Sequence, residues 1–390
     1  MKLSKINISV ITGSRAEYGL LKNLLLLLKK DKKINLNLIV TGSHLSKSHG
    51  NTYTEIINDG FKVFEKIHLK FVKGKNSEIL NSMSKLLVSY DKIFSKKKPD
   101  LVIVLGDRYE LLPAAISCLI NNYNLAHIHG GEITNGAYDD EIRHCISKIA
   151  KMHFVTHHKH KKRLIQMGEI EKNIHNVGGL GVDAINKIKT VPQKKIEKKF
   201  KFKFLKKNIL VTFHPVTKEQ INIKMQVNNL INALKKLKDT FILFTGVNAD
   251  TNYLIIKKKI MEFAKNSTNC KIVTSLGQKN YYSILKYIDA VVGNSSSGIL
   301  EVPSFGIATI NIGSRQEGRI QSNSVINCSY DKKDIFKAIN KIYNFKFKRK
   351  LKNSNNPYGK PGASKKIYNI IKKYKKFNFE KKFIDLNFKY

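Results

Sequence analysis

Residues 125–140 read LAHIHGGEITNGAYDD, and this stretch joins a short apolar run to a polar turn and the start of a helix. The run 125–129 predicts a buried strand. From Asp139 onward, the spacing of Asp140 and Arg143 places both on one helical face. The turn carries histidines, a glutamate and glycines, which are costly to bury but suited to proton transfer. We therefore expect reactive side chains at the carboxyl end of a strand; the alternative is a solvated loop with helix-capping acids.

The same alternation of short apolar runs and longer helical patterns recurs along the chain. Such alternation is typical of βαβ units and a parallel sheet. A late helix is expected at 362–376, followed by an aromatic and basic tail. The expected strands, besides the one above, are 6–11, 36–41, 101–105, 209–213, 241–244, 271–274, 290–292 and 308–312.

The length of 390 residues suggests two domains rather than one core. The fold class is α/β, with an N-terminal Rossmann-like domain at 1–190 that carries most acid and base residues. A lysine-rich linker at 191–207 leads to a nucleotide-binding domain at 208–376, which includes the late helix, and to the tail 377–390. Because ligands of such sheets bind beyond the carboxyl ends of the strands, we expect the two parallel sheets to face a central cleft.

The net charge of +42 comes from lysines that are dispersed along the whole sequence. No basic stripe with interleaved aromatics is present, so we expect no nucleic-acid partner. No run of about 18 apolar residues exists, so we expect no membrane span. The four cysteines are far apart and form no CxxC pair, which fits neither a zinc site nor a disulfide framework and favours a reducing cytoplasm.

Two glycine- and serine-rich turns can hold anions. GSRAEYG at 13–19 turns a strand into a helix, where backbone amides and the fork of Arg15 suit a phosphate; it lacks the Walker and GxGxxG patterns, and a plain strand–helix turn is equally compatible. NSSSG at 294–298 offers hydroxyls and amides to a diphosphate, and Glu301 suits a ribose diol, although serine capping also explains this turn. Arg315 lies in a further turn of this kind.

Two more strand ends carry titratable groups. Asp107 follows one strand beside Arg108, which favours its ionised form. His214 follows another, and the proline after it fixes the turn. We expect no metal site, because no His-x-x-x-His pair and no acidic cluster of ligand spacing is convincing. His157, His158 and His160 are expected on a solvated helix and are given no role.

Taken in order, these motifs resemble the hydrolysing UDP-N-acetylglucosamine 2-epimerases, and the likeness runs from about residue 6 to about residue 372. The nearest subgroup makes sialic-acid-type or legionaminic-acid-type sugars in bacteria. Several relatives have glutamate where this chain has His129, and non-hydrolysing relatives have lysine where it has Leu20. The matching segments are GSRAEYG at 13–19, GDR at 106–108, HIHGGE at 127–132, DD at 139–140, TFHP at 212–215, GNSSSG at 293–298 with Glu301, and NPYGKPGAS at 356–364.

The resemblance implies a GT-B-like pair of domains without a cofactor, and commonly a homo-oligomer, either dimer or tetramer. It implies loss of the C2 proton and of UDP to give a glycal, followed by addition of water with inverted configuration at C2. We expect Asp107, Glu132 and Asp139 around the sugar, His129 as a proton carrier and His214 at the diphosphate or leaving group; which carboxylate acts as base in which step stays open. The positions that match nucleotide-holding residues are Arg15, Arg108, Asn248, Ser295, Ser296, Glu301 and Arg315.

Three other functions remain open at this point. The same chemistry could act on UDP- or GDP-N,N′-diacetylbacillosamine in the legionaminic acid pathway. A GT-B glycosyltransferase would share the fold but would need an acceptor and would not invert C2. The third alternative is not an enzyme but a basic nucleic-acid-binding protein, and the dispersed lysines argue against it.

Overall fold

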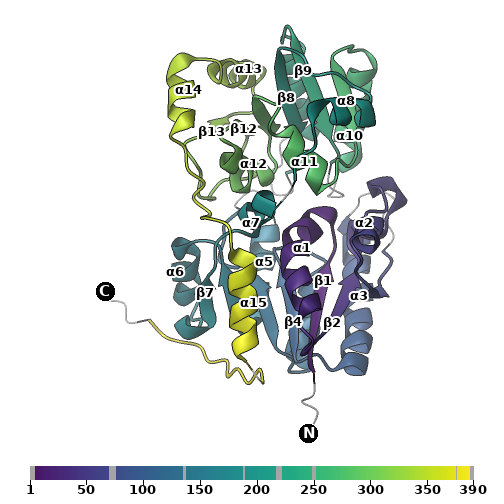
Figure 1. Cartoon of the computed structure of the whole chain (residues 1–390), viewed down its shortest axis with the longest axis vertical. Coiled ribbons are helices and arrows are strands. Elements are labelled where there is room, and N and C mark those ends of the chain that lie inside the picture. The colour runs from purple at the N-terminus through teal and green to yellow at the C-terminus, as the bar shows by residue number, and fades with distance from the viewer. Residues whose placement is uncertain are drawn as a thin grey trace. The chain divides into compact units, whose positions relative to one another are not determined.

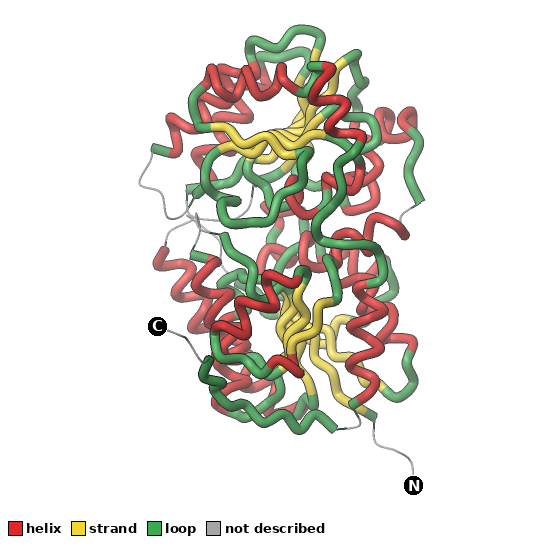
Figure 2. The backbone as a smooth tube through the Cα atoms, turned by 90° about the vertical axis from the view of Figure 1, so that its left-hand side faces the viewer, coloured by secondary structure: helices red, strands yellow, loops and turns green. Residues whose placement is uncertain are grey.

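The structure is a computed structural model that describes residues 5–69, 76–134, 138–187, 189–216, 222–247, 252–374 and 376–386. It divides into two compact units (Figure 1). Unit 1 comprises Met1–Glu132, Asp139–Asn186 and Tyr358–Tyr390, and unit 2 comprises Ile133–Tyr138 and Lys187–Pro357. Each unit has its own parallel sheet enclosed by helices (Figure 2), which confirms the expected α/β class with two domains.

Unit 1 has a seven-stranded sheet in the order β3-β2-β1-β4-β5-β6-β7. Its central strand, LVIVL at 101–105, is buried along its whole length, as expected of a strand covered by helices on both faces. The elements are β1 (Ile6–Thr12), α1 (Arg15–Lys30), β2 (Ile34–Val40), α2 (Tyr53–Asn58), β3 (Val63–Lys66), α3 (Asn76–Lys97), β4 (Leu101–Leu105), α4 (Leu112–Ile120), β5 (Leu125–Ile128), α5 (Asp139–Ile149), β6 (Met152–Val155), α6 (His158–Gln166), β7 (Ile174–Asn176), α7 (Leu180–Lys187) and α15 (Ala363–Lys373), with short 3₁₀ turns at Gly42–Leu45, Lys47–His49 and Glu171–Asn173.

Unit 2 has a six-stranded sheet in the order β10-β9-β8-β11-β12-β13, the same winding as in unit 1. Its core is formed by the strands together with α9, α10 and α13. The elements are α8 (Gln193–Phe200), β8 (Lys207–Thr212), α9 (Ile223–Leu234), β9 (Thr240–Thr245), α10 (Tyr253–Lys265), β10 (Cys270–Val273), α11 (Gln278–Ile284), β11 (Ala290–Gly293), α12 (Ser297–Leu300), β12 (Ala308–Ile312), β13 (Val325–Cys328), α13 (Lys332–Lys341) and α14 (Phe345–Lys352), with a 3₁₀ turn at Val302–Phe305.

The strand orders fix where each unit can bind a ligand. In unit 1 the order reverses between β1 and β4, and in unit 2 between β8 and β11. Neighbouring loops leave the sheet on opposite faces at such a reversal, which opens a crevice at the carboxyl ends of those strands. The turns that follow these four strands begin at Gly13, Gly106, Phe213 and Asn294. Among the residues expected to act, they carry or lead directly into Arg15, Asp107, Arg108, His214, Ser295 and Ser296.

The C-terminal part of the chain differs from the expectation. We placed 362–376 in the second domain, but α15 packs against α1 in unit 1, where Ile367 and Ile371 are buried (Figure 1). The backbone amides of Gly362 and Ser364 donate to the Asp183 carboxylate at 2.8 and 3.1 Å. The reason is tertiary: the apolar face of this helix completes the unit 1 core.

The stretch 191–207 also differs from the expected linker. It contains α8, whose lysines face solvent while Ile196 is buried. The Val191 amide donates to Ser283 Oγ at 2.9 Å, and the ring of Phe202 stacks on Phe241. The segment is therefore an ordered part of unit 2, because its few apolar residues are spaced to reach the core.

Residues 376–386 of the tail pack along unit 1. Asn124 donates to the Phe377 carbonyl at 2.8 Å, and Lys381 forms an ion pair of 2.6 Å with the buried Glu169. Hydrogen bonds from both Lys381 and His153 hold the pKa of Glu169 at about 2, against the opposing effect of burial. Across the described residues, no helix has the length and apolar content to cross a membrane.

Candidate functional site

Arg143 is the centre of an acid cluster in unit 1. It lies on α5, and its side chain is fully buried. Its guanidinium pairs with Asp107, which follows β4, and with Asp140 Oδ1 at 2.9 Å, and it donates to the Glu132 carbonyl at 3.0 Å. Because a buried charge needs close partners, these contacts bring the Asp107 turn, the Glu132 turn and the start of α5 together.

Glu132 and His129 lie side by side at the carboxyl end of β5. His129 Nδ1 is 3.5 Å from Glu132 Oε1, and both side chains are buried. The backbone of His129 has φ +68°, a region that costs free energy for a residue with a Cβ, so the surrounding structure must enforce this turn. Strained residues of this kind concentrate at functional sites.

A relay of hydrogen bonds extends from Glu132 toward α6. Thr156 donates its hydroxyl to Glu132 Oε1 at 3.1 Å, so its oxygen accepts from His160 Nδ1 at 2.8 Å. The expectation that His160 lies on a solvated face is wrong: it is only 3% exposed. The face of α6 that carries His160 therefore packs inward, where the His160 ring hydrogen-bonds Thr156.

His127 ties the Asp107 turn to α5. Its Nε2 is 2.7 Å from the Gly106 carbonyl and its Nδ1 is 3.0 Å from Ser147 Oγ. Burial lowers the pKa of His127 to about 3, so the ring is neutral. The ring therefore donates from Nε2 to the carbonyl and accepts the hydroxyl of Ser147 at Nδ1. Asp139 opens α5, one turn before Arg143.

The turn after β1 forms a capped helix start. Ser14 Oγ accepts the Glu17 amide at 3.4 Å, and Glu17 Oε2 accepts the Gly13 amide at 2.8 Å. Arg15 is the first residue of α1 and is partly exposed, so its charge adds to the positive end of the helix dipole. The charge of Arg15 and the helix dipole suit an anionic ligand.

Asn294 is the corresponding centre of unit 2. It is fully buried, and its side chain accepts the His214 amide at 2.7 Å and donates to the His214 carbonyl at 2.8 Å. The backbone carbonyl of Asn294 accepts from Arg315 Nη1 at 3.2 Å and from Gln316 Nε2 at 2.9 Å. These contacts bring His214, Arg315 and the serine turn to one end of the sheet.

The serine turn continues into α12. Ser295 and Ser296 follow Asn294 directly, and Ser297 donates to Glu301 Oε2 at 2.7 Å. Gly293 precedes the turn with φ +134°, and a Cβ there would collide with the Thr212 backbone. Only glycine therefore allows β8 and β11 to approach this closely. The expected nucleotide residue Asn248 lies outside the described residues.

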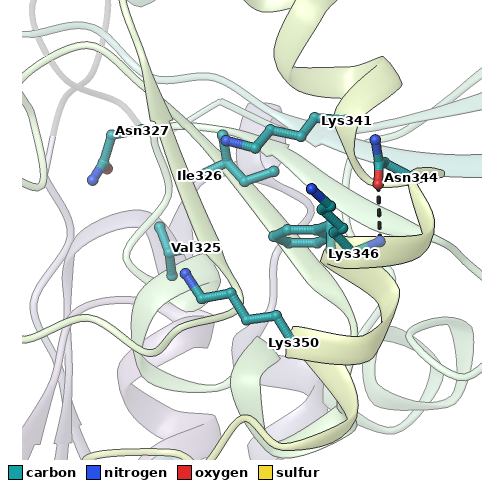
Figure 3. A pocket seen from close by; sticks show the side chains of 8 residues that line it. Val325, Ile326, Asn327, Lys341, Asn344, Lys346 and Lys350 are labelled. Carbon is teal, nitrogen blue, oxygen red and sulfur yellow. Dashed lines mark hydrogen bonds between the residues drawn. The ribbon is translucent and has the colours of Figure 1, made fainter.

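One cavity lined by described residues lies away from these groups. This cavity of about 560 Å³ lies beside β13, α13 and α14 (Figure 3). None of the described residues that line it is among the residues expected to act. It is lined by Val325, Ile326, Asn327, Lys341, Asn344, Lys346, Phe347 and Lys350. Within the same described ranges, no group of three His, Cys, Asp or Glu side chains could hold a metal ion.

Comparison with known proteins decides the family. The sequence profile of the family described as UDP-N-acetylglucosamine 2-epimerase matches residues 27–372. The chain belongs to this family. The GDP/UDP-N,N′-diacetylbacillosamine 2-epimerase (hydrolyzing) of Campylobacter jejuni is 39% identical over 348 residues, which is 89% of this chain and 90% of that protein. The polysialic acid biosynthesis protein P7 of Escherichia coli is 38% identical, and the match covers 93% of each chain.

A solved structure extends the likeness to the fold. The UDP-GlcNAc 2-epimerase of Neisseria meningitidis, solved with UDP-GlcNAc bound, superposes with a TM-score of 0.81 at 18% identity, covering 95% of this chain and all of that one. The family resemblance seen in the motifs and the GT-B-like pair of α/β units are thus confirmed. Arg143 and His127 of unit 1 and Asn294 of unit 2 were not among the residues expected to act, although each joins several of those residues. The signals for them were the Asp140–Arg143 spacing and the motifs at 127–132 and 294–298.

Proposed function

We propose that this epimerase-family chain hydrolyses UDP-N-acetylglucosamine with inversion at C2, releasing N-acetylmannosamine and UDP for the synthesis of sialic-type acids. The observation that carries this proposal is the acid cluster joined by Arg143 at the reversal point of unit 1. Family membership and the relatives at 38–39% identity support the reaction class. We further propose a cytoplasmic location, since the four cysteines are free thiols.

The diphosphate and nucleotide are proposed to bind through Arg15, Arg108, Ser295, Ser296, Glu301, Arg315, His214 and Asn248. Arginine forks and helix-terminal amides stabilise the negative charge that develops on the leaving oxygen when the C1–O bond breaks. Each such donor typically contributes about 3 kcal/mol to the transition state. His214, whose backbone is fixed by Asn294, is proposed to contact the diphosphate or to protonate the leaving group.

The acid cluster is proposed to move the C2 proton. This proton is weakly acidic, so its removal must be coupled to the departure of UDP, which leaves a C1=C2 double bond. Water then adds oxygen to C1 while C2 is protonated from the opposite face. Asp107, Glu132 and Asp139 supply carboxylates for these transfers, and His129 supplies a second type of proton carrier beside Glu132.

The test is NMR of the purified protein with UDP-N-acetylglucosamine in D2O. We expect free UDP and N-acetylmannosamine with deuterium at C2, because the proton returned to C2 comes from solvent. UDP release that requires an acceptor, with no deuterium at C2, would identify a glycosyltransferase instead. Turnover of no nucleotide sugar would exclude both.

A second substrate is favoured by the similarity to the Campylobacter jejuni relative, which is named for GDP/UDP-N,N′-diacetylbacillosamine. That sugar carries a second acetamido group, and the chemistry at C1 and C2 is the same. Measuring kcat/KM for UDP-N-acetylglucosamine and for the UDP- and GDP-linked diacetamido sugars in one UDP- or GDP-release assay decides between them. The substrate with the highest kcat/KM is the one for which the pocket is built.

Removing single phosphate donors should weaken nucleotide binding. We expect Ser296→Ala or Arg15→Ala to raise the Kd for UDP about tenfold, because a hydrogen bond to a charged group contributes about 1.5–3 kcal/mol. Isothermal titration calorimetry measures this directly. Ser267→Ala, at the end of α10, is the matched control and should bind UDP normally. Unchanged affinity in both Ser296→Ala and Arg15→Ala would remove these turns from the nucleotide site.

We propose that the chain forms a homodimer through α3 and α4. These helices pack together and expose large apolar side chains: Leu80 is 66% exposed, Val88 55%, Leu119 57% and Ile120 77%. Large apolar side chains exposed on neighbouring helices are typical of an association site. In a two-fold contact each substitution acts twice, so Ile120→Glu should convert the dimer to a monomer in light scattering, whereas Met261→Glu on α10 should not. A monomeric wild-type protein would contradict the proposal.

A further inference from the structure

Arg108 is held between two buried carboxylates at the reversal point of unit 1. Its Nη2 is 3.1 Å from Glu110 Oε1 and its Nε is 3.1 Å from Glu110 Oε2, which makes a two-point ion pair. The same Nε is 3.7 Å from Glu17 Oε1. Glu110 is fully buried and Glu17 is 6% exposed, while the Arg108 side chain keeps 16% exposure. The arginine is the member of this triad that reaches solvent most.

The two carboxylates also lie close to one another. A Cβ added at Gly13 would contact both, at 3.6 Å from Glu17 Oε2 and 3.7 Å from Glu110 Oε1. A Cβ at Gly42 would come within 2.9 Å of Glu110 Oε1. The glycines thus leave room for two acids beside one arginine. With both acids ionised the buried group carries one net negative charge, which is costly in a poorly solvated position.

We propose that Glu17 is a positioning residue whose protonation state controls how strongly Arg108 attracts the diphosphate of the substrate. The inference rests on the proposed function, in which Arg108 contacts the nucleotide sugar. When Glu17 is protonated, the triad is neutral and Glu110 alone orients the guanidinium. When Glu17 is ionised, the triad is negative, so a nearby diphosphate is attracted less.

The groups that face Glu17 support a change in its protonation state near neutral pH. Burial raises the pKa of Glu17 to about 7, and Glu110 adds to this effect while Arg108 opposes it. Within its own turn, Glu17 also accepts from Ser14 Oγ at 3.1 Å and from the Gly13 amide. Burial lowers the pKa of His44 to about 3, and burial raises the pKa of Tyr90 well above its usual value, so neither changes charge in this range.

The sign of the pH effect follows. Below pH 7 Glu17 is mostly protonated and the substrate binds more tightly; above pH 7 it is ionised and KM rises. We expect the KM for UDP-N-acetylglucosamine to increase about three- to tenfold between pH 6 and pH 8.5, on the order of the 1.4 kcal/mol that corresponds to a factor of ten. The diphosphate diester of the substrate keeps its charge throughout, whereas the terminal phosphate of free UDP titrates near pH 6–7, so the sugar nucleotide is the correct probe.

The experiment measures KM and kcat across this range in the wild type, Glu17→Gln, Glu110→Gln and the exposed control Glu65→Gln. In Glu17→Gln we expect KM to stay near the low-pH value of the wild type, with no rise. In Glu110→Gln the rise in KM should occur at lower pH, because the substitution removes the negative charge of Glu110, which raises the pKa of Glu17. Glu65→Gln should follow the wild type.

Two results would overturn the inference. One is a wild-type KM that stays flat from pH 6 to 8.5 in an enzyme that turns over normally. The other is a Glu17→Gln variant that keeps the wild-type rise. The wild-type profile alone tests the inference even if a variant fails to fold. Absence of turnover at every pH in the wild type would instead contradict the proposed function itself, so the two failures are distinguishable.

Discussion

Asp107→Asn should reduce turnover at least a thousandfold while UDP still binds within a few-fold of the wild type. Asparagine keeps the shape of the side chain but cannot accept a proton, and general acid–base catalysis typically contributes about 10²–10⁴-fold. The variant also loses the ion pair with Arg143, which orients this turn. Initial rates of UDP release and calorimetry with UDP measure the two effects separately.

The control for this variant is Asp100→Asn, in the turn before β4. Asp100 accepts the backbone amide of Asn7 at 2.7 Å, at the opposite end of the strand from Asp107. This substitution should alter stability slightly and leave turnover within about twofold, as is usual for changes away from the reacting groups. If Asp107→Asn kept near-normal turnover, Asp107 would have no part in the chemistry.

Arg143→Gln should lower both stability and turnover. The substitution leaves the carboxylates of Asp107 and Asp140 without their buried counter-charge, and breaking such a pair typically costs about 3–5 kcal/mol. We expect an unfolding midpoint in urea that is clearly lower and a kcat reduced at least a hundredfold, because the Asp107 turn and the Glu132 turn lose their common partner.

Two comparisons sharpen this second prediction. Arg143→Lys restores the charge but not the planar fork, so it should recover part of the stability and little of the turnover. Arg349→Gln, on the exposed face of α14, should change the free energy of unfolding by no more than about 0.5 kcal/mol. Wild-type kcat in a folded Arg143→Gln would show that the cluster is structural only.

Much of the fold could be predicted from the sequence, because the central strands are buried and strongly apolar. The strands 101–105 and 308–312 match their predicted bounds. The strands that were missed are short and lie at or near sheet edges, such as β7 with the sequence IHN and β13 with VINC. Edge strands bury less apolar surface, so they carry a weaker pattern.

The site was predictable where it depends on one strand end and unpredictable where it depends on two. Most motif residues lie in turns that begin at a strand end, so their positions could be read locally. The pairing of Arg143 with Asp107, or of Glu17 with Arg108, requires knowing that β1 lies beside β4 and that α5 packs near both. Such neighbours are set by the winding of the sheet, and nothing in the spacing along the chain encodes them.

The return of the chain to unit 1 through α15 has a consequence for synthesis. Strands β1 to β7 emerge from the ribosome long before Ile367 and Ile371, which fill the groove against α1. Until then that groove is open to solvent and prone to aggregation, and the early-made unit must wait while all of 187–357 is translated. Unit 2 is almost entirely one continuous stretch of chain and can fold as soon as it has been synthesised. Unit 1 is therefore synthesised first but completes its folding last.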